Sequence, residues 1–448
     1  MPSRMQAVGW ALRPLPFMER CRERYGDLFT LRVRGRPWVF LSDPADVGKV
    51  LTITPELVRA GAAEANPLLE PLLGPRSVML LDEPEHMTHR KFILPSFHGA
   101  RMRGYGEMMV EVAREEIARW PIGEPLALWP RMQSISNEVV MRAVFGRTEG
   151  EHMERLRVLL RHLTDWLNDS TRLTWVSVFG SGWLARNAQF REAMASVEAA
   201  LMEEVRRRRA APRRAEDEGI LSLLEEAYDE NGTPMTDQEL RDELITLLSD
   251  GPTATSLAWA FERLLRHPDK LARLREEALA GEEDAYADAV VKEILRLCPA
   301  VPLVMRKLVQ PMELGDYTIA AGTTVAPCIY LVHHREDIYP HPYSFMPERF
   351  LDRTPDTYTW IPFGSGVRRC VAASFAQLEM RLVMHTVLQE VELSAVGSDS
   401  ERPARSSVAF APGDQARVVV TRRRPWTRAV GGGVSDAPSP RPIPSPAA

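Results

Sequence analysis

Hydrophobic residues recur at two different spacings along this chain, which separates its helical parts from its strands. Over residues 371–391, apolar side chains return every three or four positions, the period of a buried helix. Residues 28–33 and 38–41 are instead rich in β-branched and aromatic residues, and the Arg-Gly-Arg-Pro of 34–37 between them predicts a hairpin. Amphipathic segments follow one another over residues 102–206. The chain is therefore expected to be mainly α with a small β portion.

A further helical segment begins with a recognisable capping signal. Thr236 is followed three residues later by Glu239, which is the pattern of a capping box. The apolar period continues to His267, and Pro268 ends it. Pro252 lies inside this run and lacks the N–H that a helix interior requires. We therefore expect one long helix with a local kink at Pro252.

Length and composition allow a large core in one or two domains. The chain has 448 residues, of which 45% are hydrophobic. A net charge of -5 with scattered basic residues argues against a nucleic-acid partner. No apolar run approaches the roughly 18 residues of a membrane span, and the chain starts without a signal-peptide pattern. We expect a cytoplasmic protein without a membrane span, ending in a disordered Pro/Gly/Ser-rich tail over residues 424–448.

One cysteine stands in a setting that favours chemistry. The spacing of the four cysteines indicates neither a disulfide framework nor a zinc site. Cys370 ends a glycine-containing loop and directly precedes the helix predicted from residue 371, whose N-terminal N–H groups and dipole favour a thiolate. Gly366 allows backbone amides to approach the sulfur, Phe363 can shield it from water, and Arg368 keeps its surroundings electropositive. A nucleophile, an iron ligand and an inert buried cysteine all remain possible at this point.

The loop also carries a family motif. Phe363, Gly366, Arg368 and Cys370 fit the pattern Phe-x-x-Gly-x-Arg-x-Cys-x-Gly, and in this the chain resembles the cytochromes P-450, whose haem-binding loop has that pattern. The final glycine is replaced by Ala372, which adds a methyl group where the family helix packs close to the porphyrin. The loop-then-helix context that the motif requires is present.

The resemblance implies a cofactor and the residues that hold it. It implies a cytochrome P-450 haem domain over residues 1–423, with the family's triangular α-rich prism as its fold and haem b (iron protoporphyrin IX) as its cofactor. Cys370 would be the metal ligand, a thiolate that favours O–O cleavage. His86 and Arg90, four apart on one helix face, would bind a propionate, to which forked arginine donors are suited; the alternative is a solvated basic face. The other implied cofactor-binding residues are Arg306, Arg368, Phe363 and Gly366.

The chain departs from the family at the expected proton relay. The family usually carries Ala-Gly-x-Asp/Glu-Thr in its central helix, whereas residues 248–256 contain no acidic residue immediately before a threonine. Asp250 and Thr253 lie three apart and are the candidate catalytic residues of a substitute relay. The alternative is a helix that is interrupted for packing reasons.

A second group of charges is expected to be structural. Glu293 and Arg296 form an i,i+3 pair that by itself is common on helices. The family pairs them with the arginine of a Pro-Glu-Arg-Phe segment, which is Arg349 here, so the resemblance implies a buried lock that positions the cysteine loop. Three histidines nearby are interpreted as structural rather than metal-binding: His333, His334 and His341.

Three irregular stretches are expected to border the pocket by the same resemblance. Residues 58–84 form a long loop without a clean period, which in a compact domain is usually functional. Residues 299–306 contain too many prolines for a helix and would line the pocket. Residues 407–420 would form a terminal hairpin that turns around residues 412–414 and enters the pocket.

The resemblance implies insertion of one oxygen atom from O₂ into a hydrophobic small molecule such as a terpenoid, fatty acid or polyketide. Electrons would come from a ferredoxin and ferredoxin reductase, the ferredoxin docking on the cysteine side near Arg101, Arg103 and Arg369. The altered relay keeps a peroxygenase, or a non-oxygenative isomerase or dehydratase, as alternatives. A haem-binding sensor or carrier without turnover is a third class.

Overall fold

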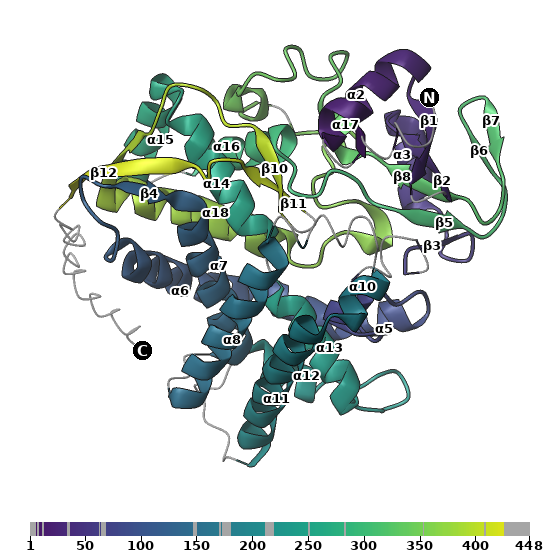
Figure 1. Cartoon of the computed structure of the whole chain (residues 1–448), viewed down its shortest axis with the longest axis horizontal. Coiled ribbons are helices and arrows are strands. Elements are labelled where there is room, and N and C mark those ends of the chain that lie inside the picture. The colour runs from purple at the N-terminus through teal and green to yellow at the C-terminus, as the bar shows by residue number, and fades with distance from the viewer. Residues whose placement is uncertain are drawn as a thin grey trace, which may run out of the picture.

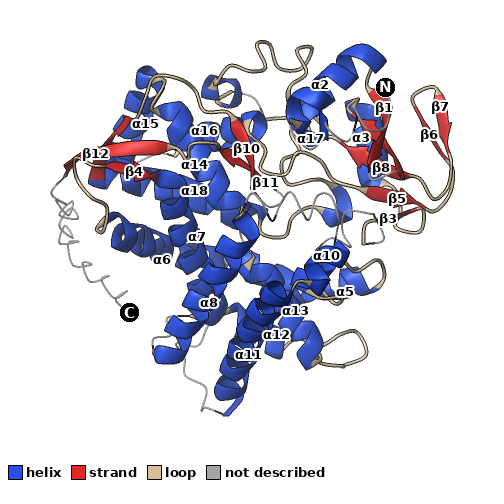
Figure 2. Ribbon diagram, viewed as in Figure 1, coloured by secondary structure: helices blue, strands red, loops and turns tan. Residues whose placement is uncertain are grey.

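Helices form most of the described chain, and short strands gather in small sheets around them (Figure 2). The computed structural model describes residues 6, 9–10, 13–33, 36–61, 63, 69–146, 150–169, 172, 181–210, 219–249, 251–281, 284–352, 354–406 and 409–424. The expected class, mainly α with a small β portion, is confirmed. The predicted tail lies outside the described residues from position 425 onward.

In Figure 1 the first elements of the chain lie at the upper right, beside the N-terminus, and the later helices of its first half lie in the lower part of the molecule. Its helices are α2 (Pro14–Tyr25), α3 (Pro44–Thr52), α4 (Glu70–Leu73), α5 (Glu85–Ile93), η2 (Leu94–Phe97), α6 (Ala100–Ile117), α7 (Leu128–Phe145), α8 (Glu151–Asn168), α10 (Ser181–Arg186), α11 (Ala188–Ala210) and α12 (Ile220–Glu225).

The second half supplies the remaining helices of the described chain. They are α13 (Asp237–Leu248), α14 (Pro252–Leu264), α15 (Pro268–Ala280), α16 (Ala285–Leu297), α17 (Ile329–His333), η3 (Pro347–Phe350), η4 (Gly366–Arg368) and α18 (Ala373–Glu390). The helix predicted over residues 371–391 is therefore confirmed as α18, which packs against α6, α14, α15 and α16.

The strands of the described chain form four small sheets. They are β1 (Leu28–Val33), β2 (Arg36–Leu41), β3 (Val58–Arg59), β4 (Pro125–Ala127), β5 (Arg306–Leu308), β6 (Met312–Leu314), β7 (Tyr317–Ile319), β8 (Thr324–Pro327), β9 (Val391–Ala395), β10 (Pro403–Ser406), β11 (Ala409–Pro412) and β12 (Arg417–Arg423). The largest sheet has the order β1-β2-β8-β5-β3, and β4-β12-β9 form a second. The predicted hairpin of β1 and β2 is confirmed, with Leu31 opposite Trp38.

The terminal hairpin was predicted in the wrong place. Strand β11 pairs with β10, which precedes it, and not with β12. Strand β12 instead pairs with β9 and β4, so the segment around residues 412–414 joins two different sheets. The sequence signal of a turn at Gly413 was real, but a turn does not specify which strands pair across it.

The helix expected to run from Thr236 to His267 is two helices rather than one kinked helix. Helix α13 begins with the predicted capping box, in which the Thr236 side chain accepts from the Glu239 N–H and the Glu239 side chain accepts from the Thr236 N–H. It ends at Leu248, and α14 starts with Pro252 at its first position. A proline at the first position of a helix costs no hydrogen bond, because the first N–H groups have no partner within the helix.

Helix α14 runs through the largest hydrophobic cluster of the described chain. Leu257, Ala258, Ala260 and Phe261 are fully buried there, against helices that include α7, α16 and α18. Burial on all sides fixes this helix rigidly and places its N-terminal turn beside the cysteine loop's cavity. None of the described helices combines the length and the apolar character needed to cross a bilayer.

Candidate functional site

The cysteine loop is closed by backbone hydrogen bonds before α18 begins. The Cys370 N–H donates to the Phe363 carbonyl at 2.9 Å, and the Gly364 N–H donates to the Ile361 carbonyl at 3.0 Å. Cys370 is exposed towards a cavity of about 1420 Å³ that it helps to line. The Phe363 ring lines the same cavity and meets the Trp360 ring edge-on at 6.3 Å. The loop thus holds one sulfur at a fixed place on the cavity wall.

Two glycines of this loop adopt backbone conformations that favour glycine. Gly364 has φ +68° and Gly366 has φ +66°. A Cβ on Gly366 would lie 2.1 Å from the Leu51 carbonyl oxygen near the end of α3, whereas a Cβ on Gly364 would meet nothing within 4 Å. Gly366 therefore allows the loop to pack closely against α3.

Four basic side chains from three separate segments line the same cavity as Cys370. His86 and Arg90 come from α5, Arg306 from β5 and Arg368 from the cysteine loop. His86 hydrogen-bonds Glu83 at 2.6 Å. The structure therefore brings together all four residues that the sequence predicted to bind propionates.

Burial and mutual repulsion lower the pKa values of these four basic side chains. Burial, helped by the nearby Arg368 guanidinium, lowers the pKa of Arg306 to about 10. Burial also lowers the pKa of His86 to about 4, with Arg368 acting in the same direction. The pKa values of Arg90 and Arg368 are lowered as well, again chiefly by burial. Cations held this way would gain from an anionic ligand, which relieves their repulsion.

Two acidic residues that the sequence analysis missed complete the group. Asp82 lies 3.4 Å from Arg368, and Glu83 accepts from both His86 and the Met87 N–H. Arg368 also donates to the Leu81 carbonyl. The Asp-Glu-Pro preceding α5 was the available signal, because acidic residues at a helix N-terminus often order the side chains of its first turn.

The composition of this group fits the cofactor that the sequence implied. Haem b carries two propionates, and arginine and histidine side chains are suitable donors for them. The neighbouring Cys370 thiol group would be a suitable ligand for its iron. The cavity is large enough for a porphyrin together with a second molecule, as its volume of about 1420 Å³ indicates.

The break between α13 and α14 faces the same cavity. Ser249, Pro252, Thr253 and Ser256 all line it. The Ser256 hydroxyl donates to the Pro252 carbonyl at 3.0 Å, and Thr253 is buried at 5% exposure. Candidate Asp250 lies outside the described residues, so only Thr253 of the two predicted relay residues is located. The hydroxyls of Ser249 and Ser256 were not singled out from the sequence.

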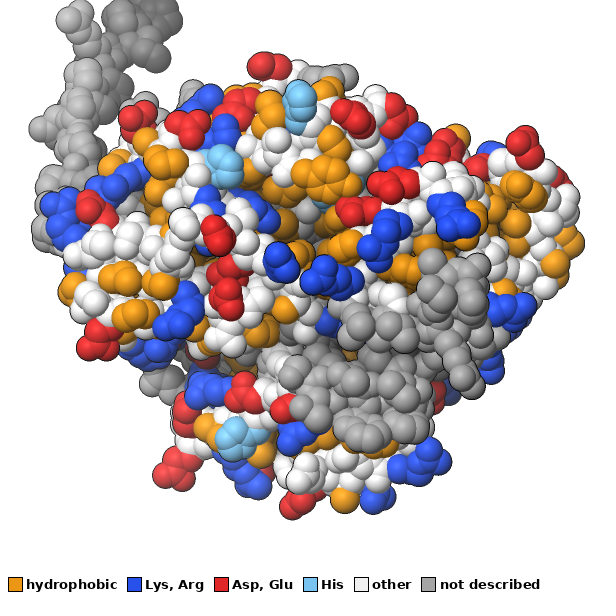
Figure 3. Space-filling view, turned by 45° about the horizontal axis from the view of Figure 1, so that its top comes forward, with side chains coloured by type: hydrophobic (Ala, Val, Ile, Leu, Met, Phe, Trp, Pro, Cys, Tyr) orange, Lys and Arg blue, Asp and Glu red, His pale blue; other side chains and the backbone are white. Residues whose placement is uncertain are grey.

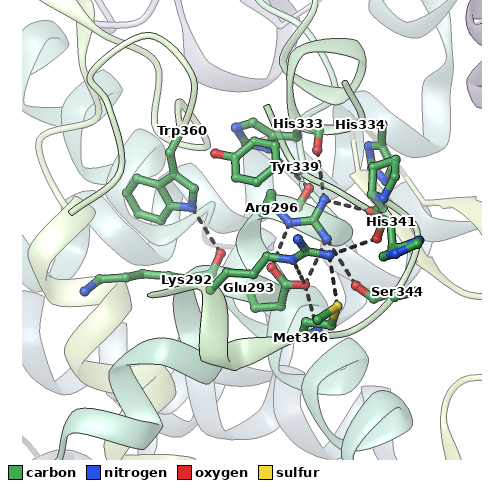
Figure 4. A network of polar contacts seen from close by, with 12 residues as sticks. Lys292, Glu293, Arg296, His333, His334, Tyr339, His341, Ser344, Met346 and Trp360 are labelled. Atoms are coloured by element: carbon green, nitrogen blue, oxygen red, sulfur yellow. Dashed lines mark hydrogen bonds and ion pairs between the residues drawn. The ribbon is translucent and has the colours of Figure 1, made fainter. Parts of the chain in front are cut away.

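The expected lock of buried charges is present in the structure (Figure 4). Arg296 and Glu293 are fully buried and joined by hydrogen bonds of 2.7 and 2.9 Å. Arg349 approaches the Glu293 carboxylate at 3.5 Å, and the Met346 N–H donates to it at 2.9 Å. The guanidinium of Arg296 also donates to the carbonyls of residues 333 and 342.

A histidine carries this network onward to the cysteine loop. The His333 ring contacts the Arg296 carbonyl through Nδ1 at 3.2 Å and accepts from the Ile361 N–H through Nε2 at 2.9 Å. The Trp360 indole N–H donates to the Lys292 carbonyl at 3.0 Å (Figure 4). Among the described residues no group of histidine, cysteine, aspartate and glutamate side chains is arranged to hold a metal. The two contacts of its ring let His333 connect the lock to the start of the cysteine loop.

The three arginines expected on the ferredoxin side lie on two elements. Arg101 and Arg103 belong to α6, and Arg369 belongs to the cysteine loop. A groove of about 890 Å³ between α6 and α18 is lined by Arg103 and Leu378, and acidic residues such as Glu107 border it too. The face drawn in Figure 3 shows the same mixture of acidic and basic side chains, with no large area of one sign.

Comparisons with known proteins match this chain to one protein family along nearly its whole length. The family model described as Cytochrome P450 matches residues 7–415. Putative cytochrome P450 135B1 of Mycobacterium bovis is 38% identical over 431 residues, covering 94% of this chain and 90% of the relative. Putative cytochrome P450 137 of Mycobacterium tuberculosis is 35% identical, covering 90% of this chain and 84% of the relative.

Two solved structures have the same fold. Retinoic acid bound cyanobacterial CYP120A1 superposes with a TM-score of 0.77 at 23% identity, covering 91% of this chain and 94% of its own. The cytochrome P450DA heme domain superposes with a TM-score of 0.76 at 23% identity, covering 92% and 93%.

Proposed function

We propose a substrate class and an electron source for this chain, which belongs to the cytochrome P450 family of haem-dependent monooxygenases. Its cofactor is accordingly haem b, and its enzyme class is oxidoreductase. The proposal is that it inserts one oxygen atom from O₂ into a hydrophobic small molecule, with electrons delivered by a ferredoxin and its reductase. The observation that carries this is that Cys370 shares one largely apolar cavity with four converging basic side chains.

The cofactor would be held at both its iron and its edge. Cys370 would ligate the iron, and His86, Arg90, Arg306 and Arg368 would bind the propionates. When bound, haem b supplies the activation of O₂ that the reaction needs. The loop around Phe363 and Gly366 would exclude water from the sulfur and keep its amides directed towards it.

The chain's own hydroxyl groups at the break between α13 and α14 would deliver protons into the cavity. We assign this to Thr253, whose buried side chain lines the cavity at the start of α14, with Asp250 as its acidic partner. The division of α13 from α14 supports this, because a helix that begins anew at Pro252 turns its first residues towards the cavity. Thr253 Oγ would pass a proton inward and regain one from the Asp250 side.

The cavity wall supports a hydrophobic substrate. Its described lining includes the apolar side chains of Leu72, Val140, Leu247, Leu295 and Phe410. The neighbour CYP120A1 was solved with retinoic acid bound, which agrees with this class. A terpenoid, fatty acid or polyketide would bury its apolar surface here with favourable free energy.

The departure at residues 250–253 favours one alternative function. No acidic residue immediately precedes a threonine there, so the enzyme would use hydrogen peroxide directly or rearrange an oxygenated substrate without O₂. The two functions differ in oxidant. Product formed with NADPH, ferredoxin reductase and ferredoxin supports the monooxygenase, and product formed only with peroxide, or with neither oxidant, supports the alternative.

The thiolate ligand is tested by one pair of variants. The reduced, carbon-monoxide-treated protein should show the red-shifted absorption band of a thiolate complex, and Cys370→Ser should lose it. Cys298→Ser is the control, because burial raises the pKa of Cys298 to about 11 and that residue lies outside the cavity lining. Retention of the band in Cys370→Ser would refute the proposal.

Two further variants test the proposed proton relay and the proposed ferredoxin-binding face, through peroxide release and turnover rate. Thr253→Ala should release more peroxide for each NADPH consumed while substrate binding stays unchanged. Arg103→Glu should slow turnover with ferredoxin but not with peroxide, because only the first requires docking. Equal coupling in Thr253→Ala and wild type would exclude Thr253 from the relay.

A further inference from the structure

The cavity is lined by basic side chains well beyond those expected to bind the cofactor. Among its described lining residues none is aspartate or glutamate, whereas six further cationic residues line it: Arg32, Arg36, Arg172, Lys307, Arg369 and Arg405. The haem propionates account for the cations near Cys370. They do not account for cations that come from the five-stranded sheet and from the β10–β11 hairpin.

The register of the sheet directs two of these cations to one face. Leu31 lies opposite Trp38, Trp38 opposite Thr324, and Thr324 opposite Lys307. Residues opposite one another in neighbouring strands project from the same face, as do residues two apart in one strand. Lys307 and Arg36 therefore project from the face that carries Trp38.

The third cation reaches the same place from another sheet. Arg405 lies opposite Phe410 in the β10–β11 hairpin, so both project from one face of it. Phe410 and Trp38 belong to the same hydrophobic cluster. The Trp259 indole N–H donates to the Phe410 carbonyl at 2.8 Å, which fixes the hairpin to α14. In Figure 1 this hairpin is drawn between α14 and the five-stranded sheet.

This group is separate from the cations beside Cys370. Arg306 and Lys307 are neighbours in β5, and neighbours in a strand project from opposite faces. Arg306 lies opposite Val325, which belongs to the cluster on the other face of the sheet, and its charge interacts with Arg368. One strand therefore supplies a cation to each of two sites.

We propose that the substrate is an amphiphilic anion, whose apolar chain fills the cavity and whose anionic head group is bound by Arg36, Lys307 and Arg405. This rests on the proposed function, in which the same cavity is the substrate pocket. Each cation at a partly exposed site should strengthen the binding of an anion by about two- to fivefold, and salt should weaken it. The head group would fix the far end of the chain and so decide which carbon approaches the cysteine side.

The test uses the haem-loaded full chain and pairs of ligands that differ in charge alone. Laurate, myristate and palmitate are each compared with the alcohol of the same length, by equilibrium dialysis and by the shift of the haem absorption band. We expect each carboxylate to bind about tenfold more tightly than its alcohol. Lys307→Gln and Arg405→Gln should weaken carboxylate binding about two- to fivefold each and leave alcohol binding unchanged.

A matched control removes the same charge elsewhere. Arg417→Gln changes an exposed arginine of β12 that lies outside the cavity lining, and it should alter neither affinity. The proposal is overturned if carboxylates and alcohols bind equally, if the variants weaken both classes alike, or if no member of the series binds. The carbon-monoxide spectrum distinguishes a failure of this proposal from a failure of the proposed function. If the thiolate band is intact and any of these results is obtained, the monooxygenase proposal stands and only the anionic substrate is refuted.

Discussion

Removing the negative charge of Glu293 should destabilise the protein far more than removing a nearby surface charge. Glu293 and Arg296 have no exposed side-chain surface, and the carboxylate also accepts from the Met346 N–H. In Glu293→Gln an amide NH₂ would face a buried guanidinium. Breaking a buried pair in this way costs about 3–5 kcal/mol.

For a chain of this size, the loss of about 3–5 kcal/mol corresponds to a small but measurable decrease in melting temperature. Unfolding entropy of about 2.1 cal/mol/K per residue gives about 0.9 kcal/mol/K for 448 residues. Glu293→Gln should therefore lower Tm by about 3–5 °C in circular dichroism melts of the haem-loaded protein. The thiolate band should weaken too, because Arg296 connects through His333 to the start of the cysteine loop.

Two further variants test whether Glu293 and Arg296 stabilise the protein as a buried pair. Glu348→Gln alters a half-exposed glutamate in the same Pro-Glu-Arg-Phe segment and should shift Tm by about 1 °C or less. The double variant Glu293→Leu/Arg296→Met removes both charges and should be more stable than the sum of its single changes by about 2 kcal/mol or more. Strict additivity, or equal shifts for Glu293→Gln and Glu348→Gln, would show that the pair does not act as a buried lock.

Three other predictions concern the cysteine loop, a buried histidine and the β10–β11 hairpin. Gly366→Ala should abolish the thiolate band, because its Cβ would collide with a backbone carbonyl of α3. Gly364 has a similar φ but open space around its Cβ position, so Gly364→Ala should lower the free energy of unfolding by only about 1–2 kcal/mol. Equal loss of the thiolate band in the two variants would contradict this reasoning. Burial lowers the pKa of His334 to about 3, so its neutral form stabilises the fold above its ordinary pKa of about 6.5, and that stability is lost as pH falls. The difference in unfolding free energy between wild type and His334→Asn should therefore narrow by about 2 kcal/mol from about pH 7 to pH 5, and a constant difference would exclude the mechanism. Trp259→Phe removes the indole donor to the β10–β11 hairpin and should cost about 1–2 kcal/mol in denaturant unfolding, while unchanged stability would mean that packing alone holds the hairpin.

The cysteine loop could be predicted from sequence because its chemistry is local. Its glycines, the bond from the Cys370 N–H to the Phe363 carbonyl and the helix that follows all lie within one short segment. The capping box of Thr236 and the hairpin of β1 and β2 were predictable for the same reason: each is specified by residues a few positions apart.

By itself, then, the sequence determined the class of fold, the cysteine that supplies the sulfur and four basic residues that line the same cavity. It did not determine that α13 and α14 are separate helices, that β12 pairs with β9 rather than β11, or that Lys307 and Arg405 line one cavity. Those features depend on which apolar surfaces are buried against each other across long stretches of chain. Burial energy is non-directional and carries no local signature, so only the packed tertiary structure decides where such residues meet.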